Sequence, residues 1–139
     1  MHRGLEARLK LDFPELFREP RVRCYVGNGW EPLLRRLCVA LATPGLGPAP
    51  NNPQHDLTFV QIKQKFGYLR AYIAGDGYGR HLRMRAGQES LLICETCGED
   101  GKLGILDGWI SVACQECADG TVANGREARW IEVHDGDSD

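Results

Sequence analysis

Four cysteines in the last third of the chain form two C-x-x-C pairs, Cys94 with Cys97 and Cys114 with Cys117. Sixteen residues separate the pairs, which is within the spacing expected of a four-cysteine zinc site. Two residues between ligands let a tight turn direct both sulfurs at one ion about 2.3 Å away, and Gly98 gives the first turn its backbone freedom. We therefore expect these four cysteines to hold one structural Zn²⁺ per chain.

Two other chemistries are open to the same quartet, namely a pair of disulfides and a redox-active C-x-x-C. No secretion signal points to an oxidising compartment in which disulfides persist. Four protein ligands also close the coordination sphere, which leaves no position for a catalytic water. The remaining cysteines, Cys24 and Cys38, have no further ligands at a suitable spacing, and we expect both to be buried as small hydrophobic residues.

The elements between the two cysteine pairs must position these ligands. Between the pairs, the pattern predicts two short strands, about 103–106 and 109–113, joined by the turn dipeptide Asp107-Gly108. Two cysteine turns with a hairpin between them are typical of a zinc ribbon. We expect an α+β domain over residues 1–92, a zinc ribbon over 93–133 and a disordered acidic tail over 134–139.

The first domain is expected to be a small sheet with a β-hairpin packed on one main helix. Helical spacing of Trp30, Leu34, Leu37, Cys38 and Leu41 predicts that helix over residues 30–42, with Trp30 in the core. A strand is expected over 21–26, an exposed loop over 44–56 and a short helix after residue 80. Asp12 and Glu15 form a capping-box pattern, which predicts a helical turn from there to about residue 17.

The hairpin is predicted over residues 57–74, with its turn near Phe66-Gly67. Strict alternation would place Val60 and Ile62 on one face. The stretch QKFGYLRAY, residues 64–72, partly matches the strand with which RNA-recognition domains stack bases. Gln64, Lys65 and Ala71 fill the places where that signature has a basic residue, a glycine and an aromatic residue, so we do not expect an RNA-recognition domain.

Charge is divided between the two ends of the chain. Residues 1–93 contain 14 Lys or Arg against 8 Asp or Glu, whereas residues 94–139 contain 3 against 11. The formal net charge is −2, so no overall positive field draws the protein to nucleic acid or to a membrane surface. Any such binding must be local. The candidate partner-binding residues are Lys63, Lys65 and Arg70 at a basic pole and Glu95, Glu99, Asp100 and Glu116 at an acidic pole.

Residues 13–117 resemble a group of small accessory proteins of bacteriophages and prophages. The matching residues are Glu15, Leu16 and Phe17; Gly27, Gly29 and Trp30; Lys63, Lys65, Phe66, Gly67, Leu69 and Arg70; and the four ribbon cysteines. Two positions depart from the pattern, since the cysteine expected directly before the Gly-x-Gly turn stands earlier as Cys24, and Tyr68 replaces a glycine of the hairpin. The resemblance implies an origin in a mobile element and brings no catalytic role.

Two functions are compatible with these observations. In the first, a non-catalytic accessory protein binds and inhibits a host protein or ribonucleoprotein complex, such as nucleic-acid machinery or a CRISPR defence effector. In the second, a zinc-ribbon regulator binds nucleic acid through the hairpin, where aromatic and basic residues interleave; these aromatics are Phe59, Phe66, Tyr68, Tyr72 and Tyr78.

We do not expect an enzyme, because no nucleophile–base pair or open metal site stands out, and the one pair to name is His81 with Asp76. The N-terminus lacks a signal peptide and no stretch approaches the roughly 20 apolar residues of a membrane span. The expected location is therefore the cytoplasm of a bacterial host, without membrane contact. The oligomeric state is left open.

Overall fold

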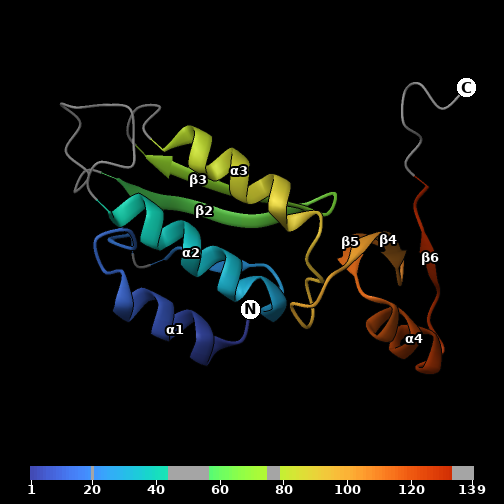
Figure 1. The fold of residues 1–139 in the computed structure, drawn as a ribbon. Coiled ribbons are helices and arrows are strands. Elements are labelled where there is room, and N and C mark those ends of the chain that lie inside the picture. The colour runs from blue at the N-terminus through green and yellow to red at the C-terminus, as the bar shows by residue number, and fades with distance from the viewer. Residues whose placement is uncertain (20, 44–56, 75–78, 133–139) are drawn as a thin grey trace, which may run out of the picture.

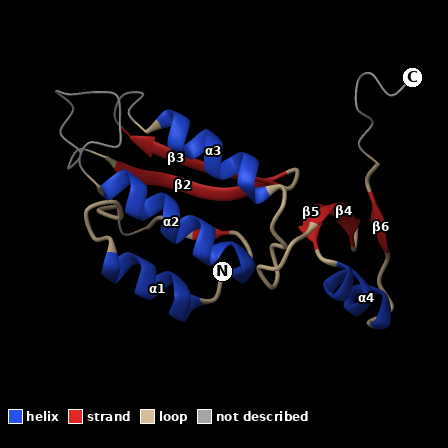
Figure 2. Ribbon diagram, viewed as in Figure 1, coloured by secondary structure: helices blue, strands red, loops and turns tan. Residues whose placement is uncertain are grey.

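The computed structural model describes residues 1–19, 21–43, 57–74 and 79–132, which form an α+β fold as predicted (Figure 1). Two small sheets alternate with helices along the chain (Figure 2). The elements are α1 (Arg3–Asp12), β1 (Cys24–Tyr25), the 3-10 turn η1 (Asn28–Trp30), α2 (Glu31–Ala42), β2 (Thr58–Lys65), β3 (Tyr68–Ala74), α3 (Arg80–Ser90), β4 (Lys102–Leu106), β5 (Trp109–Ala113), α4 (Gln115–Ala123) and β6 (Ala128–Trp130). The predicted 44–56 loop and 134–139 tail lie outside the described residues.

The first sheet has the order β1-β2-β3, in which β1 is parallel to β2 and β2 is antiparallel to β3. Its inner face packs on α2, whose apolar stripe is buried as predicted. Figure 1 shows α2 and α3 in front of this sheet. Trp30, Cys24 and Cys38 all lie in the core that the sheet and the helices share. Burial raises the pKa of the Cys24 thiol to about 12, which suits a core residue and not a metal ligand.

A β-bulge changes which side chains of β2 face the core. The register with β3 shifts between Phe59 and Gln61, so that Phe59 and Ile62 are both buried while Val60 is exposed. The expectation that Val60 and Ile62 share a face is therefore wrong. One extra residue on the bulged strand breaks the alternation of buried and exposed side chains. No local sequence pattern indicates that the bulge lies between Phe59 and Gln61.

Helices close both edges of the first sheet. On α3, the Ser90 hydroxyl accepts a hydrogen bond from the Leu69 backbone N–H at 3.0 Å, and the Arg83 guanidinium donates to the Ala71 carbonyl at 3.0 Å. On α1, the buried Glu6 carboxylate accepts from the Cys24 backbone N–H. These contacts satisfy three backbone groups that the two edge strands would otherwise leave unpaired.

The capping-box prediction at Asp12 and Glu15 is wrong, because Asp12 is the last residue of a helix and not the cap of one. The helix α1 precedes it, and the chain then makes a turn that buries Leu16 and Phe17 against the sheet. The Leu16 carbonyl accepts from the Phe59 backbone N–H at 2.7 Å. Asp12 instead accepts a hydrogen bond from Arg35 of α2 at 2.7 Å. The helix ends here because Phe13 precedes Pro14, and the residue before a proline is disfavoured in the helical conformation.

The outer face of the first sheet carries basic and aromatic residues. Pairing registers place Tyr25, Lys63 and Arg70 in one row across the three strands. Tyr25 and Arg70 are exposed and Lys63 is half-buried. In the neighbouring rows lie Tyr72 and Lys65, both exposed. We call this surface, made of Tyr25, Lys63, Lys65, Arg70 and Tyr72, the outer sheet face.

The ribbon contains the predicted hairpin and two elements that were not predicted. β4 and β5 are joined by Asp107 and Gly108, whose φ angles of 51° and 83° are those of the tight hairpin turn expected from this dipeptide. β6 adds to the other side of β4, and α4 connects β5 to β6. Short helices and single edge strands have weak periodicity, which explains why the sequence pattern did not indicate them.

The ribbon packs directly against the turn between β2 and β3. At Gly67, a Cβ atom would lie 2.4 Å from the Leu103 side chain, so the backbone of the turn touches β4. The Gln64 side chain donates to the Ile110 carbonyl of β5 at 2.7 Å. Val112 of β5 belongs to the main core. The ribbon is therefore joined to the first sheet by close packing at Gly67, by the hydrogen bond of Gln64 and by the shared core.

Candidate metal centre

The structure brings together the four cysteines that the sequence singled out. The Sγ atoms of Cys94, Cys97, Cys114 and Cys117 all lie within 4.8 Å of one another, and those of Cys97 and Cys114 are 3.6 Å apart. Four sulfurs placed tetrahedrally about 2.3 Å from one ion would be separated by about 3.8 Å. The four thiols are thus positioned to hold a metal ion.

The first cysteine turn is held by its own backbone. The Gly98 N–H donates to the Cys94 carbonyl at 2.9 Å, and the Cys94 N–H donates to the Glu99 carbonyl at 2.7 Å. Gly98 has a φ of 87°, a left-handed conformation that glycine adopts without steric cost. This confirms the role that the sequence assigned to Gly98. Cys94 is fully buried and Cys97 is exposed, so one ligand faces the core and the other faces solvent.

The second pair sits at the start of α4. Cys114 is the N-cap residue, and its Sγ atom accepts a hydrogen bond from the Cys117 backbone N–H at 3.4 Å. Both sulfurs therefore lie at the positive end of a helix, where a thiolate is stabilised by the helix dipole and by free N–H groups. The helix begins between the two cysteines of this pair, so Cys114 caps it and Cys117 lies in its first turn.

The thiols differ in how readily they lose a proton. Burial raises the pKa of the Cys94 thiol, but hydrogen bonds from the backbone N–H groups of Cys97, Cys114 and Thr96 outweigh that effect and lower it to about 7. Burial raises the pKa of the Cys117 thiol. Metals bind the thiolate form, so the backbone N–H groups around Cys94 favour the form of this thiol that a metal needs.

A glycine-rich turn far away in the sequence forms the seat for the first cysteine turn. The Gly29 N–H donates to the Glu95 carbonyl at 2.7 Å, and the Gly27 N–H donates to the Glu95 carboxylate at 2.9 Å. The Trp30 Nε1–H donates to the Ile93 carbonyl at 2.8 Å. We call residues 27–30 the seat. The sequence marked Gly27, Gly29 and Trp30 as part of a motif, but gave no sign that they contact the metal centre.

Replacing Gly29 with alanine should destabilise the protein. A Cβ atom at residue 29 would lie 2.2 Å from the Cys94 carbonyl oxygen and 2.5 Å from the Gly98 nitrogen, so either the seat or the cysteine turn must move. We expect Gly29→Ala to lower the free energy of unfolding by about 1–3 kcal/mol, as overpacked sites do, and to weaken metal binding measured by competition with a chelating dye.

The matched control for that substitution is Gly120→Ala in α4, where a Cβ atom would meet nothing within 4 Å. Alanine is favoured over glycine inside a helix by about 0.5–1 kcal/mol, so this variant should be as stable as the original or more so. Equal stability and equal metal affinity for the two variants would contradict the proposed seating.

The residues of the acidic pole do not share one environment. The Glu99, Asp100 and Glu116 side chains are exposed around the metal centre. Glu95 is half-buried, and its carboxylate also accepts from the Gln64 side chain at 3.2 Å. Glu95 therefore bridges the seat, the hairpin and the cysteine turn. The Glu95 carboxylate thus makes hydrogen bonds within the protein, whereas the exposed carboxylates of Glu99, Asp100 and Glu116 face solvent.

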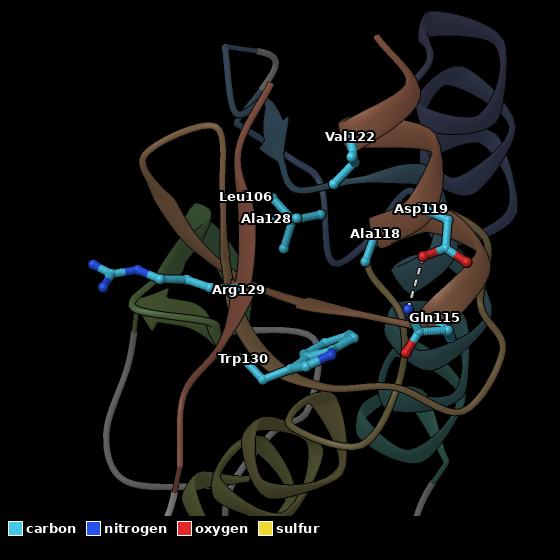
Figure 3. Close-up of a pocket in the computed structure, with 8 residues that line it drawn as sticks. All are labelled: Leu106, Gln115, Ala118, Asp119, Val122, Ala128, Arg129 and Trp130. Carbon is cyan, nitrogen blue, oxygen red and sulfur yellow. Dashed lines mark hydrogen bonds between the residues drawn. The ribbon is translucent and has the colours of Figure 1, made fainter. Parts of the chain in front are cut away.

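The structure also places the sequence candidate His81 and a small cavity beside α4. His81 is exposed on α3, and Asp76 lies outside the described residues. A small cavity of about 80 Å³ lies between α4 and β6, beside Trp130 and Leu106. Figure 3 shows Arg129 pointing away from this cavity and Gln115 bonded to Asp119 at its rim. It is well below the roughly 300–1,000 Å³ of sites for small-molecule ligands.

No family model, curated protein or solved structure matches the chain. The resemblance to phage proteins therefore stays an expectation from the motifs. Among the described residues, no helix is long and apolar enough to cross a membrane.

Proposed function

We propose that the protein is a non-catalytic, zinc-stabilised protein of the bacterial cytoplasm that binds single-stranded nucleic acid on the outer sheet face. The zinc assignment is supported by four sulfur donors that lie within 4.8 Å of one another, a set that favours Zn²⁺. Four protein ligands leave no open coordination position, so the ion is structural. The observation that carries the nucleic-acid proposal is the chemistry of the outer sheet face.

The charge of the outer sheet face has one sign. Strands β1, β2 and β3 contain three basic residues, Lys63, Lys65 and Arg70, and no Asp or Glu. All three are on the outer sheet face, within one row or the next. The chain as a whole carries a formal charge of −2, so this positive charge is local. A phosphate backbone is the anionic partner that such a local patch suits.

Aromatic side chains on the outer sheet face add a means of contacting bases. Tyr25 is 67% exposed and Tyr72 is 38% exposed. The Lys63 ammonium lies 5.9 Å from the centre of the Tyr72 ring, so a positive charge and a ring are presented together. Bases stack on aromatic rings only where they are not paired within a duplex. The combination of exposed rings and cations therefore favours single strands over duplexes.

Charge reversal on the outer sheet face tests this proposal. We expect the triple variant Lys63→Glu, Lys65→Glu, Arg70→Glu to lose single-strand binding, because it replaces three phosphate-binding cations with anions. In the original protein, each phosphate contact contributes about −0.7 to the slope of log affinity against log salt, so three contacts predict a slope of about −2. The measurement is fluorescence anisotropy with a labelled single-stranded oligonucleotide over a series of salt concentrations.

A matched control reverses three exposed arginines elsewhere, Arg3, Arg8 and Arg21, and so changes the net charge by the same amount. This control should keep most of the affinity if the outer sheet face is the binding surface. If both triple variants bind equally well, or if the original protein binds no oligonucleotide at low salt, the proposal is wrong.

A second candidate function is binding and inhibition of a host protein complex through the acidic pole. It is supported by Glu99, Asp100 and Glu116, which are exposed next to a metal centre that would hold them rigidly. Such a surface can occupy a basic groove meant for nucleic acid. Capture of a host complex that survives nuclease treatment, and that is lost when these three residues become lysine, would favour this function over the first.

A further inference from the structure

The place where the ribbon meets the hairpin carries two exposed aromatic rings on separate elements. Trp109, at the start of β5, is 76% exposed, and Phe66, in the turn between β2 and β3, is 67% exposed. Several large apolar side chains of the described residues are exposed singly, but these two rings lie together at one junction, which needs an explanation. Phe66 is one of the hairpin aromatics that the sequence marked for nucleic-acid binding, whereas Trp109 was not marked as part of any site.

Both rings line the same open cavity, of about 390 Å³. The other lining residues are Gln64, Lys65, Gly108 and Ile110, so the cavity has a lysine at its edge and no carboxylate. This volume lies within the roughly 300–1,000 Å³ of small-molecule sites. The Lys65 ammonium lies 6.0 Å from the centre of the Phe66 ring, which presents a cation beside an aromatic surface.

The cavity is held in shape by contacts between the two parts of the chain. The turn that carries Phe66 touches β4 through Gly67, and Gln64 bonds to the Ile110 carbonyl beside Trp109. Gln64 also bonds to Glu95, next to the cysteine turn. Its walls are therefore fixed relative to each other, and Glu95, which also contacts the seat, connects them to the first cysteine turn.

We infer that this cavity is a subsite in which one unpaired base of a single-stranded nucleic acid stacks on Trp109 and Phe66. The inference rests on the proposed function and deepens it. Lys65 belongs both to the outer sheet face and to the cavity, so the two surfaces are continuous. A nucleic-acid strand whose phosphates contact Lys63 and Arg70 could therefore extend past Lys65 and place its next base in the cavity. The occupant that fits these groups is a nucleotide, whose base would stack on the two exposed rings and whose phosphate would pair with the Lys65 ammonium.

Tryptophan fluorescence gives a direct test, because the chain has three tryptophans in different environments. Trp30 is fully buried, and Trp130 is half-buried, with the Lys102 ammonium 4.6 Å from its ring centre. A single strand of mixed sequence should quench the emission of Trp109 on binding. The quenching should be lost in Trp109→Phe and kept in Trp130→Phe.

Affinity provides the second measurement. Trp109→Ala should weaken binding of the single strand by roughly 5- to 150-fold, the effect of losing one stacked base, and should leave the weaker binding of a duplex unchanged. Its high exposure means that the variant should fold, which circular dichroism checks. If Trp109→Ala binds the single strand as tightly as the original and no quenching occurs, the subsite does not exist.

The two proposals fail in different ways. Binding that needs Lys63 and Arg70 but shows no quenching, and no effect of Trp109→Ala, would overturn the subsite and leave the outer sheet face as the binding surface. Absence of oligonucleotide binding at low salt would overturn both, and a nuclease-resistant protein complex would then identify a protein as the partner.

Discussion

Removal of the metal by a strong chelator is expected to unfold the ribbon and to loosen the seat at residues 27–30 as well. Binding of a structural zinc ion is worth about 10–16 kcal/mol in small zinc domains, which is comparable with the whole stability of a typical domain. The sequence alone predicts a loss confined to residues 94–117, with the hairpin and the main helix largely spared. The hydrogen bonds from Gly27, Gly29 and Trp30 to residues 93–95 extend the expected loss across the interface.

Hydrogen exchange measures this extension directly. On chelation, the amides of Gly29 and Cys94 should lose protection together, whereas amides within the pairing of β2 and β3 should lose less. Serine at Cys114 should act in the same way, and elemental analysis should then find no bound metal. The control is Cys38→Ala, which removes a buried cysteine that is not a ligand and should keep one metal ion per chain.

Two results would contradict the metal assignment. One is the absence of stoichiometric metal in the purified protein. The other is a mass showing two native disulfides among Cys94, Cys97, Cys114 and Cys117. Protection of Gly29 that does not change on chelation would leave the metal site intact as a proposal but would remove its connection to the seat.

Trp30→Ala is expected to lower the free energy of unfolding by roughly 3–5 kcal/mol, as truncation of a large core side chain does. Trp30 is fully buried in the core shared by the sheet and the helices, and its ring N–H donates to the Ile93 carbonyl at 2.8 Å. Truncation thus creates a cavity and also leaves a carbonyl next to the metal centre without its donor. Metal affinity should fall along with stability, which chemical denaturation and chelator competition measure.

Two variants separate these contributions. Trp30→Phe keeps most of the apolar volume but loses the hydrogen bond, and we expect a cost of about 1–3 kcal/mol. Trp109→Ala makes the same truncation as Trp30→Ala at a side chain that is 76% exposed, and it should cost less than about 1 kcal/mol. A cost below about 1 kcal/mol for Trp30→Ala would mean that the core is wrongly described.

The sequence by itself determined the features that depend on neighbours along the chain. The metal ligands could be identified because two residues between cysteines suffice to bring two sulfurs to one ion. The stripe of α2 and the tight turn at Asp107-Gly108 were predictable for the same reason, since each is encoded within one helix face or one dipeptide. The α+β class followed from these local patterns.

Only the tertiary structure decided which distant segments meet. Gly27 and Trp30 contact residues that are 68 and 63 positions further along the chain, and a contact at that range leaves no periodic pattern in the sequence. The β-bulge that exposes Val60 and the pairing of Asp12 with Arg35 also depend on partners outside the local segment. The outer sheet face is of the same kind, because its row of Tyr25, Lys63 and Arg70 exists only once three strands have found their register.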